Sequence, residues 1–137
     1  MTNDSSHRDT YDVGLRIRRE VLGDAHVQRS LDDASEFARP IQELVTEYAW
    51  GEVWSRPGLA RRERSLINIA MLTALNRGHE LQGHVRGALR NGVTVSEIQE
   101  VLLQTAVYVG MPAALEAFRL AEAAIADSPR VEEPAQS

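Results

Sequence analysis

The chain contains no cysteine and no lysine, and these two absences remove several kinds of chemistry. Without thiols it cannot form disulfides, thiolate metal sites, cysteine nucleophiles or dithiol redox pairs. Without lysine it cannot form a Schiff base with a carbonyl substrate. All 15 basic residues are therefore arginines, and the formal net charge is -5. A negative net charge argues against broad binding to nucleic acid, because such binding requires a positive field.

Long hydrophobic runs are also missing from the 137 residues. No apolar segment approaches the roughly 20 residues needed to span a bilayer, so we expect no membrane segment. Residues 1–9 are polar and lack the basic and apolar regions of a signal peptide, which favours a cytoplasmic protein. No alternating strand pattern and no solenoid repeat is present, so we predict an all-α fold.

Apolar residues recur at helical spacing and predict about six helices in one domain over residues 10–126. We expect the flanking residues 1–9 and 127–137 to be disordered, because they are polar. The predicted helices cover about residues 10–22, 33–50, 65–75, 80–91, 94–109 and 112–126.

Residues that start, stop or interrupt these helices are found at four places. Gly23 ends the first helix, and the segment GDAHVQRS that begins there is predicted to be a connector. Pro40 interrupts residues 33–50, which are therefore either two helices or one kinked helix. Gly92 is predicted to stop a helix, and Thr94 with Glu97 is predicted to form a capping box at the start of the next.

Residues 61–92 hold the strongest candidates for chemistry. Residues 65–75 are apolar in nearly every radial direction, which predicts a central helix surrounded by other protein. In the next helix, Glu80 and His84 lie one turn apart at the edge of an apolar stripe. A carboxylate in this position can hold an imidazole for proton transfer near neutral pH. The same spacing is also compatible with an ordinary surface Glu–His pair.

Two further groups of residues are candidates for ligand binding. Arg61 and Arg64, with Arg62 between them, precede the central helix and could simply be solvated. Positive charge is disfavoured at a helix N-terminus, so an anionic ligand is an alternative explanation. Trp50 and Trp54 are notable in a chain with only 5% aromatic residues. They fit either core or interface packing, or the wall of a ligand pocket. The histidines show no ligand spacing, so we predict no metal site.

Four segments resemble a known family: VLGDAHVQRSL, YAWGEVWSRPGL, RRERSLINIAMLTAL and ELQGHVRGALRNGVTVSEIQEVLLQTAVYVGMPAA. They resemble the γ-carboxymuconolactone decarboxylases of protocatechuate catabolism, which belong to the AhpD-like superfamily, over about residues 10–125. The peroxidase branch of that superfamily uses a glutamate, a CxxC pair and a histidine. His84 matches the histidine, whereas Ser65, Arg77 and Glu80 replace the glutamate and the two cysteines. The resemblance therefore does not extend to thiol peroxidase chemistry.

The resemblance implies an all-α AhpD-like bundle that decarboxylates 4-carboxymuconolactone, a lactone dicarboxylate, to 3-oxoadipate enol-lactone and carbon dioxide. The ring carbonyl accepts the electrons, so no cofactor is implied. Our hypothesis makes His84 the proton donor and Glu80 the residue that orients it. Arg64 or Arg61 would bind a substrate carboxylate. The family also implies a homo-oligomer, often a hexamer.

Trp50 and Trp54 would wall the substrate pocket on this hypothesis. Two alternatives stay open at the level of sequence. A thiol-independent AhpD-like oxidoreductase is weakened by the absence of cysteine. A non-enzymatic helical oligomerisation module explains the apolar helices, but it does not explain Glu80 and His84 beside an arginine-rich helix start.

Overall fold

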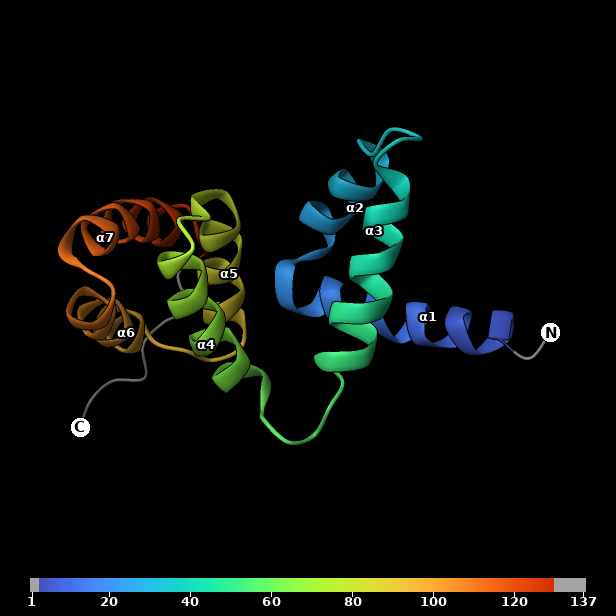
Figure 1. Ribbon diagram of the computed structural model, residues 1–137, viewed down its shortest axis with the longest axis horizontal. Helices are drawn as coiled ribbons and strands as arrows, with labels where there is room; N and C mark the ends of the chain where they lie inside the picture. The colour runs from blue at the N-terminus through green and yellow to red at the C-terminus, as the bar shows by residue number, and fades with distance from the viewer. Residues whose placement is uncertain (1–2, 130–137) are drawn as a thin grey trace. The chain divides into compact units, whose positions relative to one another are not determined.

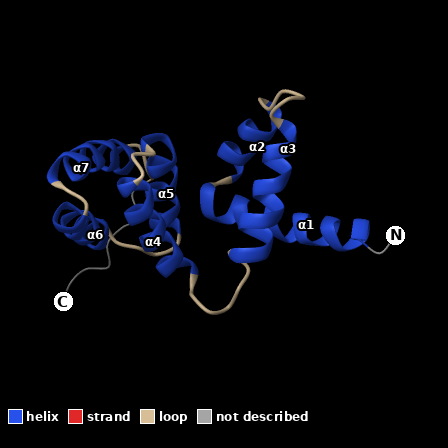
Figure 2. Cartoon of the chain, in the orientation of Figure 1, coloured by secondary structure: helices blue, strands red, loops and turns tan. Residues whose placement is uncertain are grey.

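The computed structural model describes residues 3–129, and its regular elements in that range are all helices, joined by loops (Figures 1 and 2). Seven α-helices and one π-helical segment occur between residues 3 and 129, and no strand occurs in that range. This confirms the all-α prediction, with one α-helix more than the six expected. The chain divides into two compact units, Met1–Arg64 and Ser65–Ser137. Of the residues 1–9 and 127–137 that were predicted to be disordered, residues 3–9 form the first turns of α1, whereas residues 1–2 and 130–137 lie outside the described residues.

The first unit begins with α1 (Asn3–Leu22) and α2 (Asp24–Asp32). The helix that was predicted to begin at residue 10 begins at Asn3. Its additional first turns are polar, because a helix can extend beyond the part that packs against a core without an apolar face. Gly23 ends α1 as predicted, with a φ of 93° that favours glycine. The predicted connector after it was wrong: this segment forms α2, which buries Val27.

Next come α3 (Arg39–Leu44) and the π-helix η1 (Val45–Val53), which follow one another without a break. Pro40 lies in the first turn of α3, so the predicted kink or pair of helices over residues 33–50 was wrong. A proline is tolerated there because its missing N–H would have no partner within the helix. At the other end of η1, the Trp54 amide donates to the Ala49 carbonyl over 2.9 Å, five residues back.

Two glycines allow α1 and η1 to cross at very short range. A methyl group at Gly14 would overlap the Thr46 carbonyl and lie 2.7 Å from the Gly51 amide nitrogen. A methyl group at Gly51 would overlap the Thr10 carbonyl in the same way. Backbone therefore meets backbone at this crossing, and no larger residue fits at either glycine.

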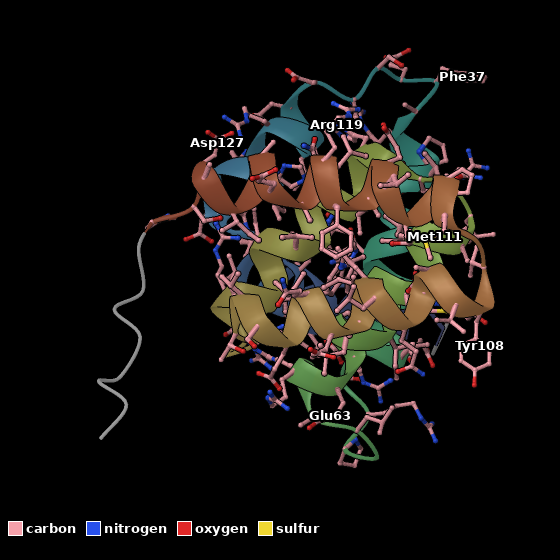
Figure 3. The ribbon with its side chains drawn as sticks, turned by 90° about the vertical axis from the view of Figure 1, so that its left-hand side faces the viewer. Phe37, Glu63, Tyr108, Met111, Arg119 and Asp127 are labelled. Atoms are coloured by element: carbon pink, nitrogen blue, oxygen red, sulfur yellow. The ribbon has the colours of Figure 1, made fainter. Side chains whose placement is uncertain are left out.

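The second unit contains most of α4 (Arg61–Ala74), followed by α5 (Gly78–Arg90), α6 (Val95–Tyr108) and α7 (Met111–Ala126). Figure 3 shows α6 and α7 side by side, with Tyr108 and Met111 extending outward where the two helices connect. The core of the second unit consists of buried aliphatic and alanine side chains from all four helices and the α5–α6 loop: Ile69, Leu81, Val85, Ala88, Val93, Ile98, Leu102, Ala117, Ala121 and Ala124.

Local sequence signals define the loop between α5 and α6 as predicted. Gly92 has a φ of 86°, the Val93 amide donates to the Ala88 carbonyl over 2.9 Å, and the helix ends in a Schellman motif. Thr94 Oγ1 accepts from the Glu97 amide, and Glu97 Oε1 accepts from the Thr94 amide, each over 3.0 Å. The predicted capping box is therefore confirmed.

The prediction that α4 is surrounded by protein is not met within the described chain. Ser65, Ile69 and Thr73 are buried along one face, whereas Ile67, Met71 and Leu75 are 44%, 48% and 65% exposed. The apolar pattern was read correctly, but only one face of α4 packs against the core of the second unit. Among the described helices, none is long and apolar enough to cross a membrane.

Candidate active site

The candidate histidine lies at a polar contact within the second unit. His84 is half-buried on α5, between Leu81 and Val85, whose buried side chains fix the face that the helix turns to the core. Its Nδ1 atom lies 3.4 Å from Nδ2 of Asn68, a half-buried residue on α4. An imidazole held by an amide and largely shielded from water is suited to acid–base work or to hydrogen bonding with a substrate.

Glu80 is exposed in the first turn of α5, one turn before His84. A carboxylate there is favoured by the positive end of the helix dipole, which gives Glu80 a structural role that needs no substrate. The His84 ring contacts Asn68. An orienting role for Glu80 stays a prediction, while Asn68 enters the site as a residue that the sequence interpretation missed.

A second polar pair lies nearby along the same two helices. The Asn91 Nδ2 atom donates to Ser65 Oγ over 2.8 Å, and Ser65 is fully buried. Ser65 takes the position of the peroxidase glutamate in the resemblance, but here its hydroxyl serves the packing of α4 and α5. A buried hydroxyl needs such a partner, because an unpaired one is costly in free energy.

The two candidate arginines differ in their partners within the first unit. Arg61 Nη1 donates to Glu20 Oε2 over 2.6 Å, so a carboxylate of the same chain already holds its charge. Arg64 Nη2 donates to the Arg56 carbonyl over 3.2 Å, and Arg64 Nε is buried with no hydrogen-bond partner. Arg64 therefore retains more capacity to bind an anion than Arg61 does.

The two tryptophans belong to the core of the first unit. Trp50 and Trp54 are both buried, together with Ile17 and Val21 of α1, and their ring centroids are 4.7 Å apart. Tilted aromatic pairs at this distance add to the stability gained from burial. Packing thus accounts for both residues, and a role as a pocket wall stays a prediction.

Arg18 is a buried cation that the sequence interpretation also missed. It is 6% exposed, and it donates to Thr46 Oγ1 over 3.0 Å and to Gln42 Oε1 over 2.9 Å. Burial lowers the pKa of its guanidinium, because both of these partners are neutral and the charge loses water. Arg18 thereby ties α1 to the point where α3 becomes η1.

Metal ligands are not grouped in the part of the chain that the structure describes. Between residues 3 and 129, no three histidine, aspartate or glutamate side chains are placed to hold a metal ion.

Comparison with known proteins shows which family and which enzymes the chain is similar to. Residues 39–123 match the model of the family described as the carboxymuconolactone decarboxylase family. The chain is 47% identical to 4-carboxymuconolactone decarboxylase of Acinetobacter baylyi, over 85% of this chain and 87% of that protein. It is 46% identical to nitrosuccinic acid decarboxylase of Metarhizium robertsii, over 92% of this chain and 88% of that protein.

Proposed function

The chain belongs to the carboxymuconolactone decarboxylase family, and on that premise we propose that it decarboxylates 4-carboxymuconolactone to 3-oxoadipate enol-lactone and carbon dioxide. Similarity to the relative of that name covers most of both chains, and it carries the choice of reaction. A peroxidase reaction is disfavoured because the chain has no cysteine. An oligomerisation module without activity is disfavoured because both relatives are named decarboxylases.

The substrate supplies the electron sink for this reaction. When the bond between the γ-carbon and its carboxylate breaks, the electron pair moves through the ring double bond to the lactone carbonyl. The product forms when the resulting dienolate takes a proton at the α-carbon. The protein must hold the acetate carboxylate, stabilise the dienolate oxygen and provide the proton. These needs can be met by side chains alone, without a cofactor.

His84 is the residue that we assign to proton delivery. It is half-buried and held by a side-chain amide, which restricts the ring and limits access of bulk water. Glu80, one turn earlier, is assigned to orienting it. Arg64 is preferred over Arg61 as the carboxylate ligand, because Arg64 Nε has no hydrogen-bond partner. In this proposal Trp50 and Trp54 support the pocket as part of its wall.

The direct test is a spectroscopic assay of enol-lactone formation with authentic 4-carboxymuconolactone and the purified full chain. We expect the wild-type protein to turn over the substrate, and His84→Gln to lower kcat by about 100-fold or more, since positioned proton transfer contributes about 10²- to 10⁴-fold. Circular dichroism would confirm that the variant is folded. Near-normal turnover in a folded His84→Gln protein would remove His84 from the mechanism.

Nitrosuccinic acid is a second candidate substrate, because the relative that acts on it is equally similar. The two substrates share a chemical pattern. In each, the carbon that loses carbon dioxide also bears a carboxymethyl group and is attached to an electron-accepting system, a nitro group or an unsaturated lactone. A comparison of kcat/KM for the two compounds would decide between them, and the larger value identifies the activity of this chain.

We also propose that the chain works as a homo-oligomer, with a hexamer as the expected form. The exposed apolar residues of α4, and the groove of about 340 Å³ between α4 and α6, support association. A cytoplasmic location stays a prediction. No binding to nucleic acid or to a membrane is part of the proposal.

A further inference from the structure

The contact between Asn68 and His84 has a chemical direction as well as a length. The atom of Asn68 that faces the ring is Nδ2, the amide nitrogen, and it lies 3.4 Å from Nδ1 of His84. An amide nitrogen carries two hydrogens and accepts nothing. For the two atoms to form a hydrogen bond, Nδ1 must therefore offer a lone pair. In a neutral imidazole this places the ring hydrogen on Nε2.

The surroundings hold Asn68 in this position. On α4 it lies between Ser65 and Ile69, both fully buried, and it is the only polar residue in the apolar run 66–72. A half-buried amide in such a run is unfavourable unless it is hydrogen-bonded. The adjoining turns of α4 and α5 are packed into the core of the second unit, so neither side chain can move far from the other.

We propose that Asn68 is a positioning residue that fixes His84 as the tautomer with hydrogen on Nε2. The inference rests on the proposed function, in which His84 presents a hydrogen to the substrate. With Asn68 at Nδ1, that hydrogen is always on the same nitrogen and adds no positive charge to the site. A neutral imidazole of this form donates a hydrogen bond to the dienolate oxygen, where negative charge develops, and it passes its Nε2 hydrogen to the α-carbon only as water returns a proton to the ring, since an imidazolate would otherwise remain.

The same helices provide a matched control. Asn91 and Ser65 form an amide–hydroxyl hydrogen bond of 2.8 Å along α4 and α5, and neither residue is assigned to the site. Ser65→Ala removes a hydrogen bond of similar kind from this pair of helices. It should therefore reproduce any loss of packing without any change at the His84 ring.

The first experiment measures the tautomer directly, by long-range ¹H–¹⁵N correlation of the histidine rings in the labelled full chain. His84 is assigned by the signals that disappear in His84→Gln. We expect the wild type and Ser65→Ala to show hydrogen on Nε2, and Asn68→Ala to show an exchange average of both tautomers. Asn68→Asp, which is nearly isosteric, should move the hydrogen to Nδ1 because a carboxylate can only accept.

A wild-type spectrum with hydrogen on Nδ1 would overturn the inference, and so would an unchanged His84 pattern in folded Asn68→Ala and Asn68→Asp. If Asn68→Ala does not fold, the Asn68→Asp spectrum alone decides the question. These results do not depend on turnover. They therefore separate failure of this inference from failure of the proposed reaction, which would appear as an inactive wild type with the expected ring pattern.

The second experiment is the corresponding kinetics with 4-carboxymuconolactone. We expect Asn68→Ala and Asn68→Asp to lower kcat by about 10- to 100-fold, the range typical of residues that orient a functional group, with little change in KM. Ser65→Ala should change either constant less than about threefold. An Asn68→Asp protein with wild-type kcat would contradict the inference, because it would show that the position of the ring hydrogen does not matter.

Discussion

Polar residues that reach from one helix to another mark the unusual positions of this chain. Asn68 on α4 and Arg18 on α1 each reach across to a neighbouring helix and meet a hydrogen-bond partner there. A buried polar group destabilises a fold unless it is hydrogen-bonded, and removing its partner can cost about 1–3 kcal/mol. Neither residue stands out in the sequence: Asn68 is a single polar residue in an apolar run, and Arg18 lies among other charged residues in the segment RIRRE. Their partners are 16 and 28 residues away, so only the packing of helices reveals them.

Arg64 and Arg61 can be separated by kinetics. We expect Arg64→Gln to raise KM for the lactone by about 10- to 100-fold, since a hydrogen bond to a charged group contributes about 1.5–3 kcal/mol. Arg61→Gln should raise KM far less, because Arg61 is held by Glu20. Steady-state assays of both variants test this ranking.

An unchanged kcat in Arg64→Gln would indicate binding that is uniform along the reaction, whereas a lower kcat would indicate a contact made in the transition state. Glu20→Gln provides the control, because it should free Arg61 without touching Arg64. A larger effect of Arg61→Gln than of Arg64→Gln would reverse the assignment.

Helices of this protein meet in different ways in the two units. In the first, α1 and η1 cross with backbone against backbone at Gly14 and Gly51. In the second, α7 buries a stripe of small side chains that includes Ala117 and Ala121. Close crossings leave no room for added atoms, because protein interiors are packed as densely as organic crystals.

The crossing in the first unit can be tested with single methyl groups. We expect Gly14→Ala and Gly51→Ala each to lower the free energy of unfolding by at least about 1–3 kcal/mol, the usual effect of overpacking. Gly83→Ala is the control: no atom lies within 4 Å of the added methyl group, and alanine favours a helix over glycine by about 1 kcal/mol. Urea denaturation of the three variants gives the comparison. Equal stability of all three would show that the crossing tolerates a side chain.

The elements most accurately predicted from sequence are those whose ends are marked by capping residues or by a terminating glycine. Gly92 and the Thr94 capping box fixed the ends of α5 and α6 because their geometry depends on local hydrogen bonds. The kink or helix break predicted at Pro40 was wrong, because proline is compatible both with a kink inside a helix and with the first turn of a helix. The π-helical segment η1 has only nine residues, too few for a pattern of apolar residues to distinguish its wider turn from that of an α-helix. His84 was found by spacing, whereas its contact with Asn68 depends on two helices that only the fold brings together.

The whole chain exposes more apolar surface than its own fold requires. Exposed apolar residues lie on several helices and just after the end of α4, among them Leu75, Leu103, Val107 and Leu115. Large apolar surface left exposed by one chain is typical of proteins that associate. The relatives named decarboxylases match nearly the full length of the chain. The helices that would form contacts between copies are therefore among the helices that carry the proposed activity.

The oligomeric state is the prediction at this scale. We expect light scattering after size exclusion to give a mass several times that of one chain, with six copies as the expected number. Leu75→Asp should lower that mass, because Leu75 is 65% exposed on an apolar face. Ala25→Asp, at an exposed position of α2, should not lower it. A wild-type mass equal to one chain would refute association.

The alanine stripe of α7 affects how firmly the register of this helix is fixed against the helices that it packs on. Alanine loses no rotamer freedom on burial, so α7 can dock with little loss of side-chain entropy. Identical small side chains, however, specify register poorly, since sliding by a turn replaces one alanine with another. Register is supplied by Leu120, whose side chain fills the space left by Gly78 and whose carbonyl accepts from Gln82 Nε2 over 3.1 Å. Leu120 and its carbonyl thus contribute to selecting a single alignment of α7, together with Phe118 and Ile125, which pack against the same core.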